Sequence, residues 1–252
     1  MDGDRRRLLA TMPLHAITST YGEAGLRERF AAEAAALSEA DRRTVQRALD
    51  LASRLHAADR RDAEPYVNHL LRVAIRIMSP SHYGVRDADV ISAALLHDAV
   101  EDHAAELSGG GGQQPGDGSQ PGDGGRQAAL AALAAGFGPR VADLVAAVTN
   151  PVYAPGRDPH QQYRQHVADS LRRDPWARVI KASDFTDNGA GLVHFSGPGL
   201  RRLAGKYAPL VPVLRELISM PDTPLDAAVK QRILAQLDRA AARFAALGGS
   251  RE

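Results

Sequence analysis

Residues Leu95–Asp102 have the sequence LLHDAVED, in which four titratable side chains close an otherwise apolar segment. Positions four apart share one face of a helix, so a helix through this segment predicts His97 beside Glu101 and Asp98 beside Asp102. Three carboxylates this close repel one another unless a cation or hydrogen bonds compensate. They also lie at the carboxyl end of the helix, where the helix dipole disfavours negative charge. The pattern favours a metal-binding or catalytic group; an exposed acidic helix end is the competing interpretation.

A second histidine stands on the preceding apolar helix pattern. His69 occupies a position of that pattern that needs a core-facing residue, where a buried structural histidine is the commoner explanation. The short connection from Met78 to Asp87 predicts, however, that the two helices are antiparallel neighbours. An ion held by a His-Asp pair needs further ligands from such a neighbour, so His69 becomes a candidate ligand.

The segment Arg178–Asn188, with the sequence RVIKASDFTDN, starts apolar and becomes polar toward its end. Asp184 and Asn188 are four apart and share a helix face. Spacing alone also allows Asp184 to be a solvated residue or an ion-pair partner of Lys181. Two imidazoles with two carboxylates would make a mixed nitrogen and oxygen site, which suits Mn²⁺, Fe²⁺ or Zn²⁺ better than Ca²⁺.

The composition limits the possible chemistry and partners. The chain has 252 residues, 44% hydrophobic and 24% charged, and no cysteine, so disulfides and thiolate metal sites are excluded. With 31 basic and 30 acidic residues, the net charge of +1 gives no reason to expect nucleic acid or an anionic membrane as a partner. Met1–Leu14 fits neither a secretory signal nor a spanning helix, and Val90–Leu96 is too short to cross a bilayer. We expect a cytoplasmic protein.

Apolar residues recur three and four positions apart along most of the chain, which predicts an all-α protein. The helices expected from this pattern are Gly25–Leu37, Ala40–Ala58, Tyr66–Met78, Asp87–Glu101, Arg126–Ala135, Pro139–Val148, His160–Arg173, Trp176–Asn188, Pro198–Met220 and Pro224–Leu247.

Residues 108–125, SGGGGQQPGDGSQPGDGG, contain no large apolar side chain and repeat the sequence QPGDG. Such a composition cannot bury enough surface to offset its ordering entropy, so we expect a flexible insertion. A linker between two domains is the competing interpretation. The insertion is favoured because candidate site residues lie on both sides of it.

The order of His69, His97-Asp98 and Asp184 resembles the H…HD…D signature of the HD phosphohydrolase superfamily. Longer segments resemble the hydrolase domain of the RelA/SpoT-type alarmone enzymes, in the right order over roughly residues 45 to 220. These segments are RRDAEPYVNHL at 60–70, AALLHDAVEDH at 93–103, and the stretches 137–149, 163–165, 180–188 and 206–210.

The resemblance implies a role for each matching residue. The ligands of one ion, usually Mn²⁺ in this family or another divalent transition metal, would be His69, His97, Asp98 and Asp184. Glu101 and Asp102 would activate and orient water. Substrate contacts would come from Arg60 on the purine base, Arg61 near the phosphates, Asn188 on the nucleotide, and Tyr66 as a supporting residue.

The resemblance also implies an HD-domain helical bundle over residues 25–222, after a poorly ordered extension at 1–24 and before a C-terminal helix at 223–252. The implied reaction is hydrolysis of the 3′-pyrophosphate of guanosine tetra- or pentaphosphate by a stand-alone hydrolase. The partner would be a phosphorylated purine nucleotide.

The chain departs from the family pattern after Asn188. Family members often carry Met-Arg-Thr there, whereas this chain has Gly189-Ala190-Gly191 and so loses an arginine and a hydroxyl beside the nucleotide. His103 and Leu70 replace a threonine and a proline, and neither change removes a ligand. An adenosine alarmone or NADPH therefore stays open as the substrate. A non-catalytic nucleotide sensor and a purely structural helical module also stay open as functional classes.

Overall fold

The computed structural model describes residues 3–61, 63–109, 123–189 and 204–248. Helices dominate these residues, and the strands form one two-stranded sheet, which confirms the all-α prediction. The chain divides into two compact units, Met1–Val152 and Tyr153–Glu252, where the sequence suggested one unit over 25–222.

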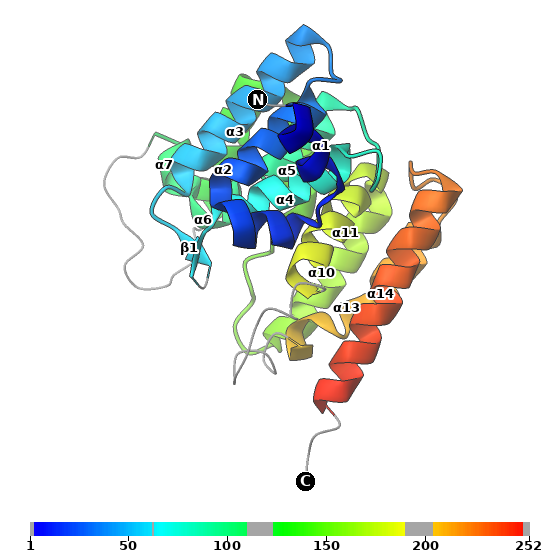
Figure 1. Cartoon of the computed structure of the whole chain (residues 1–252). Coiled ribbons are helices and arrows are strands. Elements are labelled where there is room, and N and C mark those ends of the chain that lie inside the picture. The colour runs from blue at the N-terminus through cyan, green and yellow to red at the C-terminus, as the bar shows by residue number, and fades with distance from the viewer. Residues whose placement is uncertain (1–2, 62, 110–122, 190–203, 249–252) are drawn as a thin grey trace. The chain divides into compact units, whose positions relative to one another are not determined.

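The first unit contains nine helices and a short hairpin among its described residues (Figure 1). These elements are α1 (Gly3–Thr11), α2 (Leu14–Ala34), α3 (Glu39–Leu55), β1 (Arg60–Arg61), β2 (Glu64–Pro65), α4 (Val67–Met78), α5 (Ala88–Leu95), α6 (Ala99–Asp102), α7 (Ala104–Leu107), α8 (Asp123–Phe137) and α9 (Pro139–Val148).

Helix α4 forms the centre of this unit, because all twelve of its residues are buried. It packs against α2 on one side and α5 on another, and α5 in turn packs against α3 and α9. A helix buried all round must pair its polar side chains internally. His69 is one of these side chains, so its burial follows from the position of α4.

The N-terminal residues differ from the expected poorly ordered extension, because α1 and the first half of α2 are helical. Gly22 interrupts α2 with a φ of 60°, a left-handed conformation that glycine adopts without steric cost. The predicted helix start at Gly25 therefore corresponds to the part of α2 that follows this kink. Leu9, Leu14 and Ile17 are buried and fix the earlier part.

The single helix expected over Asp87–Glu101 is wrong, because α5 ends at Leu95 and α6 begins at Ala99. Leu96 leaves the helical conformation, with φ −104° and ψ 7°. His97 and Asp98 form the turn between the two helices. The argument that His97 and Glu101 share one face of a continuous helix therefore does not apply.

The second unit contains α10 (Pro159–Arg173), α11 (Pro175–Gly189), α13 (Leu210–Ser219) and α14 (Ala227–Gly248). Phe185 of α11 makes edge-to-face contacts with Tyr207 and with Phe244 of α14, with ring centroids 5.9 and 6.4 Å apart. Arg178 is fully buried and donates to Asp222 and to the carbonyl oxygens of Leu171 and Arg172. These contacts fix α11, which carries Asp184.

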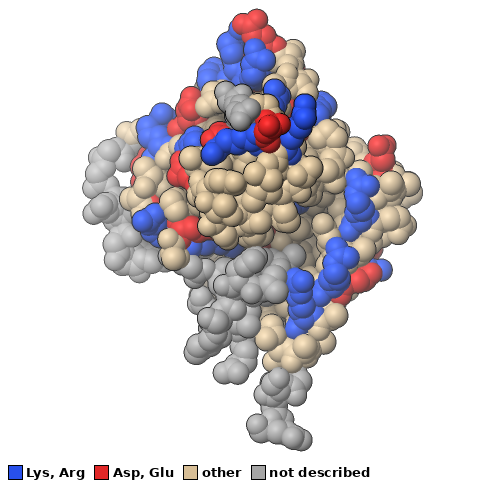
Figure 2. Space-filling model, in the orientation of Figure 1, with Lys and Arg blue, Asp and Glu red and all other residues tan. Residues whose placement is uncertain are grey.

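Two sequence predictions fall outside the described residues, namely most of the glycine-rich insertion and the start of the helix expected at Pro198. Within the parts of the chain that the structure describes, every helix is too short or too polar to cross a bilayer. Figure 2 shows acidic and basic side chains intermixed over the N-terminal helices. Arg5 forms an ion pair with Glu28, and Arg43 forms one with Glu39.

Candidate active site

Three of the candidate ligands, His69, His97 and Asp98, lie together in the first unit. His69 Nε2 is 3.4 Å from His97 Nε2, and Asp98 Oδ2 is 3.0 Å from His97 Nε2 and 3.8 Å from His69 Nε2. Both histidines are buried, whereas part of Asp98 is accessible. Three potential ligand atoms from two segments of the chain therefore converge on one point.

The tautomer of His97 is set by the turn that holds it. Its Nδ1 lies 2.8 Å from the carbonyl oxygen of Ala94, which can only accept a hydrogen bond. Nδ1 therefore carries the proton, and Nε2 presents a lone pair toward His69 and Asp98. A histidine whose other nitrogen donates to a backbone carbonyl is the usual arrangement for a metal ligand.

Tyr66, at the N-terminal end of α4, holds the carboxylate of this group. Its hydroxyl donates to Asp98 Oδ2 at 2.7 Å, and its ring lies edge-on to His69 with centroids 5.7 Å apart. Burial raises the pKa of Tyr66, and the charge of Asp98 raises it further, so the phenol stays protonated and acts as a donor. The sequence predicted a supporting role for Tyr66, and its contacts are with a candidate ligand.

Replacing Tyr66 by phenylalanine removes this hydrogen bond but keeps the ring. We expect the affinity for Mn²⁺ to fall by roughly 10- to 100-fold, the usual effect of losing a group that orients a ligand. Isothermal titration with Mn²⁺ measures the change. An unaltered affinity would show that Asp98 needs no support from the phenol.

Glu101 is held by Asn150, a residue that the sequence patterns did not single out. The side-chain Nδ2 of Asn150 donates to Glu101 Oε1 at 2.6 Å, and the backbone N of Asn150 donates to Oε2 at 3.2 Å. Asn150 follows the C-cap residue of α9, 49 positions along the chain from Glu101. Asn150 directly follows Val148-Thr149, the end of a stretch that resembles the family, and this position was the one sign in the sequence that it could belong to the site. These two donors fix the positions of both carboxylate oxygens of Glu101.

Asp102 is the carboxylate with a pKa raised to about 7. Desolvation is the largest cause, and the negative charges of Asp98 and Glu101 add to it. Because Asp102 keeps an exposed surface, water screens part of the desolvation, and we attribute more of the shift to the neighbouring charges. A group with this pKa can exchange a proton near neutral pH.

The raised pKa of Asp102 makes the stability of the metal-free protein depend on pH. An aspartate in an unfolded chain has a pKa of about 4, so the folded state is favoured by protonation of Asp102. This contribution is complete below about pH 4 and is lost as the pH rises through about 7. Relative to Asp102→Asn, the wild type should lose free energy of unfolding between about pH 5 and pH 8. Urea unfolding of both proteins in EDTA measures the difference, and parallel pH profiles would contradict it.

The hairpin of β1 and β2 carries the candidate substrate-binding arginines. In this antiparallel hairpin, Arg60 lies opposite Pro65 and Arg61 lies opposite Glu64. The side chain of Arg60 is exposed. Glu64 also accepts two hydrogen bonds from Arg72 of α4, at 2.7 and 3.0 Å. This buried arginine therefore ties the hairpin to the same helix that carries His69.

Asp184 and Asn188 lie in the second unit, on α11. Asp184 is buried, receives a hydrogen bond from Asn188 Nδ2 at 2.5 Å, and is paired with Lys181 Nζ at 2.9 Å. Desolvation alone would lower the pKa of Lys181, but the charge of Asp184 outweighs it and the pKa is raised. The expected pairing of Asp184 with Asn188 on one helix face is present, together with the ion pair to Lys181.

The donor atoms of the first unit fit a divalent ion. Two imidazole Nε2 atoms and one carboxylate oxygen, 3.0 to 3.8 Å apart, have the spacing of ligands around a transition metal. Without a cation, two buried imidazole nitrogens would lie 3.4 Å apart beside three carboxylates. The arrangement is consistent with one metal ion beside two candidate acid-base groups.

A family model for the HD domain matches residues 48–174, which is half of the chain. The chain therefore belongs to the HD domain family, and the family resemblance inferred from the sequence is confirmed.

Two curated relatives and one solved structure are similar to it. The human guanosine-3′,5′-bis(diphosphate) 3′-pyrophosphohydrolase MESH1 is 47% identical over 58 residues, 22% of this chain and 31% of the relative. The mouse MESH1 of the same description is 30% identical over 140 residues, 54% of this chain and 63% of the relative. The chain thus spans less than two thirds of each relative's length. A structure described as "A metazoan ortholog of SpoT hydrolyzes ppGpp and plays a role in starvation responses" covers 79% of this chain and 94% of its own, with TM-score 0.55 and 22% identity, which supports the same fold.

Proposed function

We propose that this protein is a divalent-metal-dependent hydrolase that removes the 3′-pyrophosphate of guanosine tetra- or pentaphosphate. The observation that carries the proposal is the convergence of His69 Nε2, His97 Nε2 and Asp98 Oδ2 beside Glu101 and Asp102. The products would be pyrophosphate and GDP or GTP, and the reaction would take place in the cytoplasm. The names of the human and mouse relatives support the choice of substrate.

The proposed ion ligands are His69, His97, Asp98 and Asp184, and the proposed ion is Mn²⁺. The first three have the distances given above, and Asp184 completes the H…HD…D order of the family. Its burial on α11 is consistent with a ligand role. We propose that residues 25–222 act together as one catalytic domain. When bound, the ion would lower the pKa of a coordinated water and neutralise charge on the phosphoryl oxygens.

The proton steps are assigned to Glu101 and Asp102. Attack of water on the 3′-phosphorus forms a P–O bond, breaks the bond to the ribose 3′-oxygen and releases one proton from the water. Glu101, fixed by Asn150, orients this water. The Glu101–Asp102 pair takes this proton, and Asp102, with its pKa of about 7, passes a proton to the ribose 3′-oxygen as that oxygen leaves.

Substrate binding is assigned to the hairpin arginines and to Asn188. A planar guanidinium suits both base stacking and forked phosphate binding, so Arg60 is proposed for the purine and Arg61 for the phosphates. Arg61 lies close enough to Tyr66 to influence its pKa, which supports a place beside the ion ligands. Asn188, which contacts Asp184, would meet the nucleotide.

The test is a product assay with purified protein and Mn²⁺, using guanosine 3′-pyrophosphates, adenosine 3′-pyrophosphates and NADPH as substrates. We expect pyrophosphate to be released from the guanosine nucleotides and not by Asp184→Ala. If the protein hydrolysed only an adenosine nucleotide or only NADPH, that compound and not the guanosine nucleotide would be its substrate. A different result would be that the protein binds a nucleotide without turning it over, with an affinity that does not change when Glu101 and Asp102 are replaced. That result would show that it is a nucleotide sensor and not an enzyme.

A further inference from the structure

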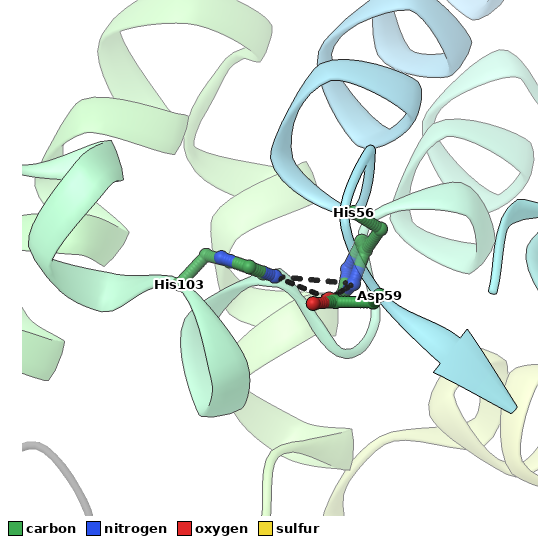
Figure 3. Close-up of side chains that lie close together, drawn as sticks. All are labelled: His56, Asp59 and His103. Carbon is green, nitrogen blue, oxygen red and sulfur yellow. Dashed lines mark hydrogen bonds and ion pairs between the residues drawn. The ribbon is translucent and has the colours of Figure 1, made fainter. Parts of the chain in front are cut away.

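A second group of histidine and aspartate side chains lies in the first unit, outside the HD signature (Figure 3). His56 is the C-cap residue of α3, Asp59 lies three positions later, and His103 directly follows α6. Asp59 Oδ2 is 2.7 Å from His56 Nδ1 and 2.7 Å from His103 Nε2, and the two nitrogens are 3.2 Å apart. We call these three residues the His56 cluster.

The local backbone brings the ligand atoms of the His56 cluster together. The backbone N of Asp59 donates to the carbonyl oxygen of His56 at 3.1 Å, so the chain turns sharply after α3 and returns Asp59 to the ring of His56. His103 approaches from a segment 47 residues further along. Figure 3 shows both imidazoles directed at the same carboxylate oxygen. Such convergence of distant segments is typical of a built site.

The protonation states suit metal binding. Burial lowers the pKa of His56, so its imidazole is neutral, and in the tautomer with the proton on Nε2 its Nδ1 offers a lone pair to an ion. Desolvation alone would raise the pKa of Asp59, but hydrogen bonds from His103 and His56 outweigh it, and the carboxylate stays ionised. Two imidazoles and one carboxylate form the three-ligand set of many zinc sites, in which a water or another group fills the fourth position.

The distances also suit a small ion. Ligands about 2.0–2.1 Å from a tetrahedral ion lie about 3.3 Å from each other, and the two nitrogens are already 3.2 Å apart. The side chain of Asp59 is 35% exposed, so it can rotate outward by the few tenths of an ångström that an ion requires. His103 Nδ1 faces Glu106 Oε1 at 3.4 Å, which gives the carboxylate–histidine–metal order found around bound ions.

A hydrogen-bonded triad without metal is the competing explanation. In that case both nitrogens donate to the single atom Asp59 Oδ2, and their two N–H groups face each other across 3.2 Å. That arrangement loses part of its energy to repulsion between the two donors. A cation at the same point relieves the repulsion and satisfies both lone pairs.

We propose that His56, Asp59 and His103 bind a second divalent transition-metal ion, separate from the ion of the HD signature. Imidazole nitrogens with one carboxylate favour Zn²⁺ over Mn²⁺ at such a site. The ion links the end of α3 to the segment after α6. Because Asp102 directly precedes His103, the ion also restricts the position of Asp102.

The aromatic ring of Tyr66 connects the two sites. It stacks on His56 with ring centroids 4.7 Å apart and an interplanar angle of 12°, while its hydroxyl holds Asp98. An ion bound to the His56 cluster would fix the His56 ring against the ring of Tyr66. It would thereby restrict the motion of Tyr66, whose hydroxyl donates to Asp98. The second ion thus has a structural role beside the proposed active site.

The experiment counts Zn²⁺ equivalents bound to the purified full-length chain after equilibrium dialysis, with Co²⁺ absorption as a second readout. We expect two equivalents for the wild type and one for the double variant Asp59→Asn/His103→Gln. The matched control is His160→Gln, which removes an exposed histidine of α10 and should keep two equivalents. Far-ultraviolet circular dichroism confirms that each variant is folded, and the single variant Asp59→Asn carries the test if the double variant is not.

The two sites are distinguished by adding His97→Ala. This change should remove one equivalent and leave the ion of the His56 cluster, whose tetrahedral Co²⁺ spectrum then stands alone. Equal binding by the wild type and Asp59→Asn/His103→Gln would overturn the proposal whatever the hydrolysis assay shows. Because this count does not depend on substrate, failure of the proposed hydrolysis would leave the result for the His56 cluster intact.

Discussion

Replacing His97 by alanine should lower kcat/KM for hydrolysis at least about 1000-fold, equivalent to roughly 4 kcal/mol of transition-state stabilisation. The proposed ligand atom His97 Nε2 lies 3.4 Å from His69 Nε2 and 3.0 Å from Asp98 Oδ2, and the residue is buried in the turn between α5 and α6. Loss of this ligand would leave His69 and Asp98 without an ion to join them. Both water activation and charge neutralisation would then disappear together.

The measurement is a Mn²⁺-dependent rate with saturating metal, together with the metal content of the purified variant. His160→Gln serves as the control, because it removes an exposed imidazole from another helix. A circular dichroism melt separates a lost ligand from a lost fold. If His97→Ala kept metal and activity within about tenfold of the wild type, the ion would have to be bound elsewhere.

Replacing Glu101 by glutamine should reduce kcat by about 10²- to 10⁴-fold, the range expected for loss of an acid-base group. Glutamine keeps the size of the side chain and can still meet the Asn150 amide, but it cannot hold or take a proton as a carboxylate does. Because Glu101 is not a proposed ligand, the Mn²⁺ affinity and KM should change little. The effect should therefore appear in kcat.

Steady-state kinetics and Mn²⁺ titration of Glu101→Gln separate these outcomes. Glu39→Gln, at an exposed glutamate in the first turn of α3, provides a matched control of the same chemistry. A variant that lost metal along with activity would make Glu101 a ligand. A variant with unchanged kcat would assign the proton transfer to Asp102 alone.

The helices were predictable where a single face is buried or the helix ends are marked by specific residues. The predicted helix Pro139–Val148 has the bounds of α9, since Gly138 precedes it with φ 95° and Pro139 occupies the first turn. The break between α5 and α6 was not predictable in the same way. Leu95 and Leu96 continue the apolar pattern, and the turn is held by contacts that this pattern does not show, among them the one between His97 Nδ1 and the Ala94 carbonyl oxygen.

Residue types and their order along the chain already indicated a metal site. His97-Asp98 carries its own signal, because adjacent polar residues after an apolar segment are unexpected in a structural helix. His69 looked like a core residue, and burial of the whole of α4 makes it both a core residue and a candidate ligand. Sequence order supplied the family; the distances among ligand atoms required the packing of α4 against α5.

The contacts between distant segments were beyond the sequence. Asn150 contacts Glu101, which is 49 positions away along the chain, and His103 contacts His56, which is 47 positions away. No periodic pattern in the sequence predicts either pair. Local patterns depend on neighbours three or four residues apart, whereas these pairs depend on how whole helices pack. Residue types and their order therefore predicted the helical class and the HD signature. The packing of separate helices establishes which side chains support those residues, because hydrogen bonds and ligand distances arise where separate helices meet.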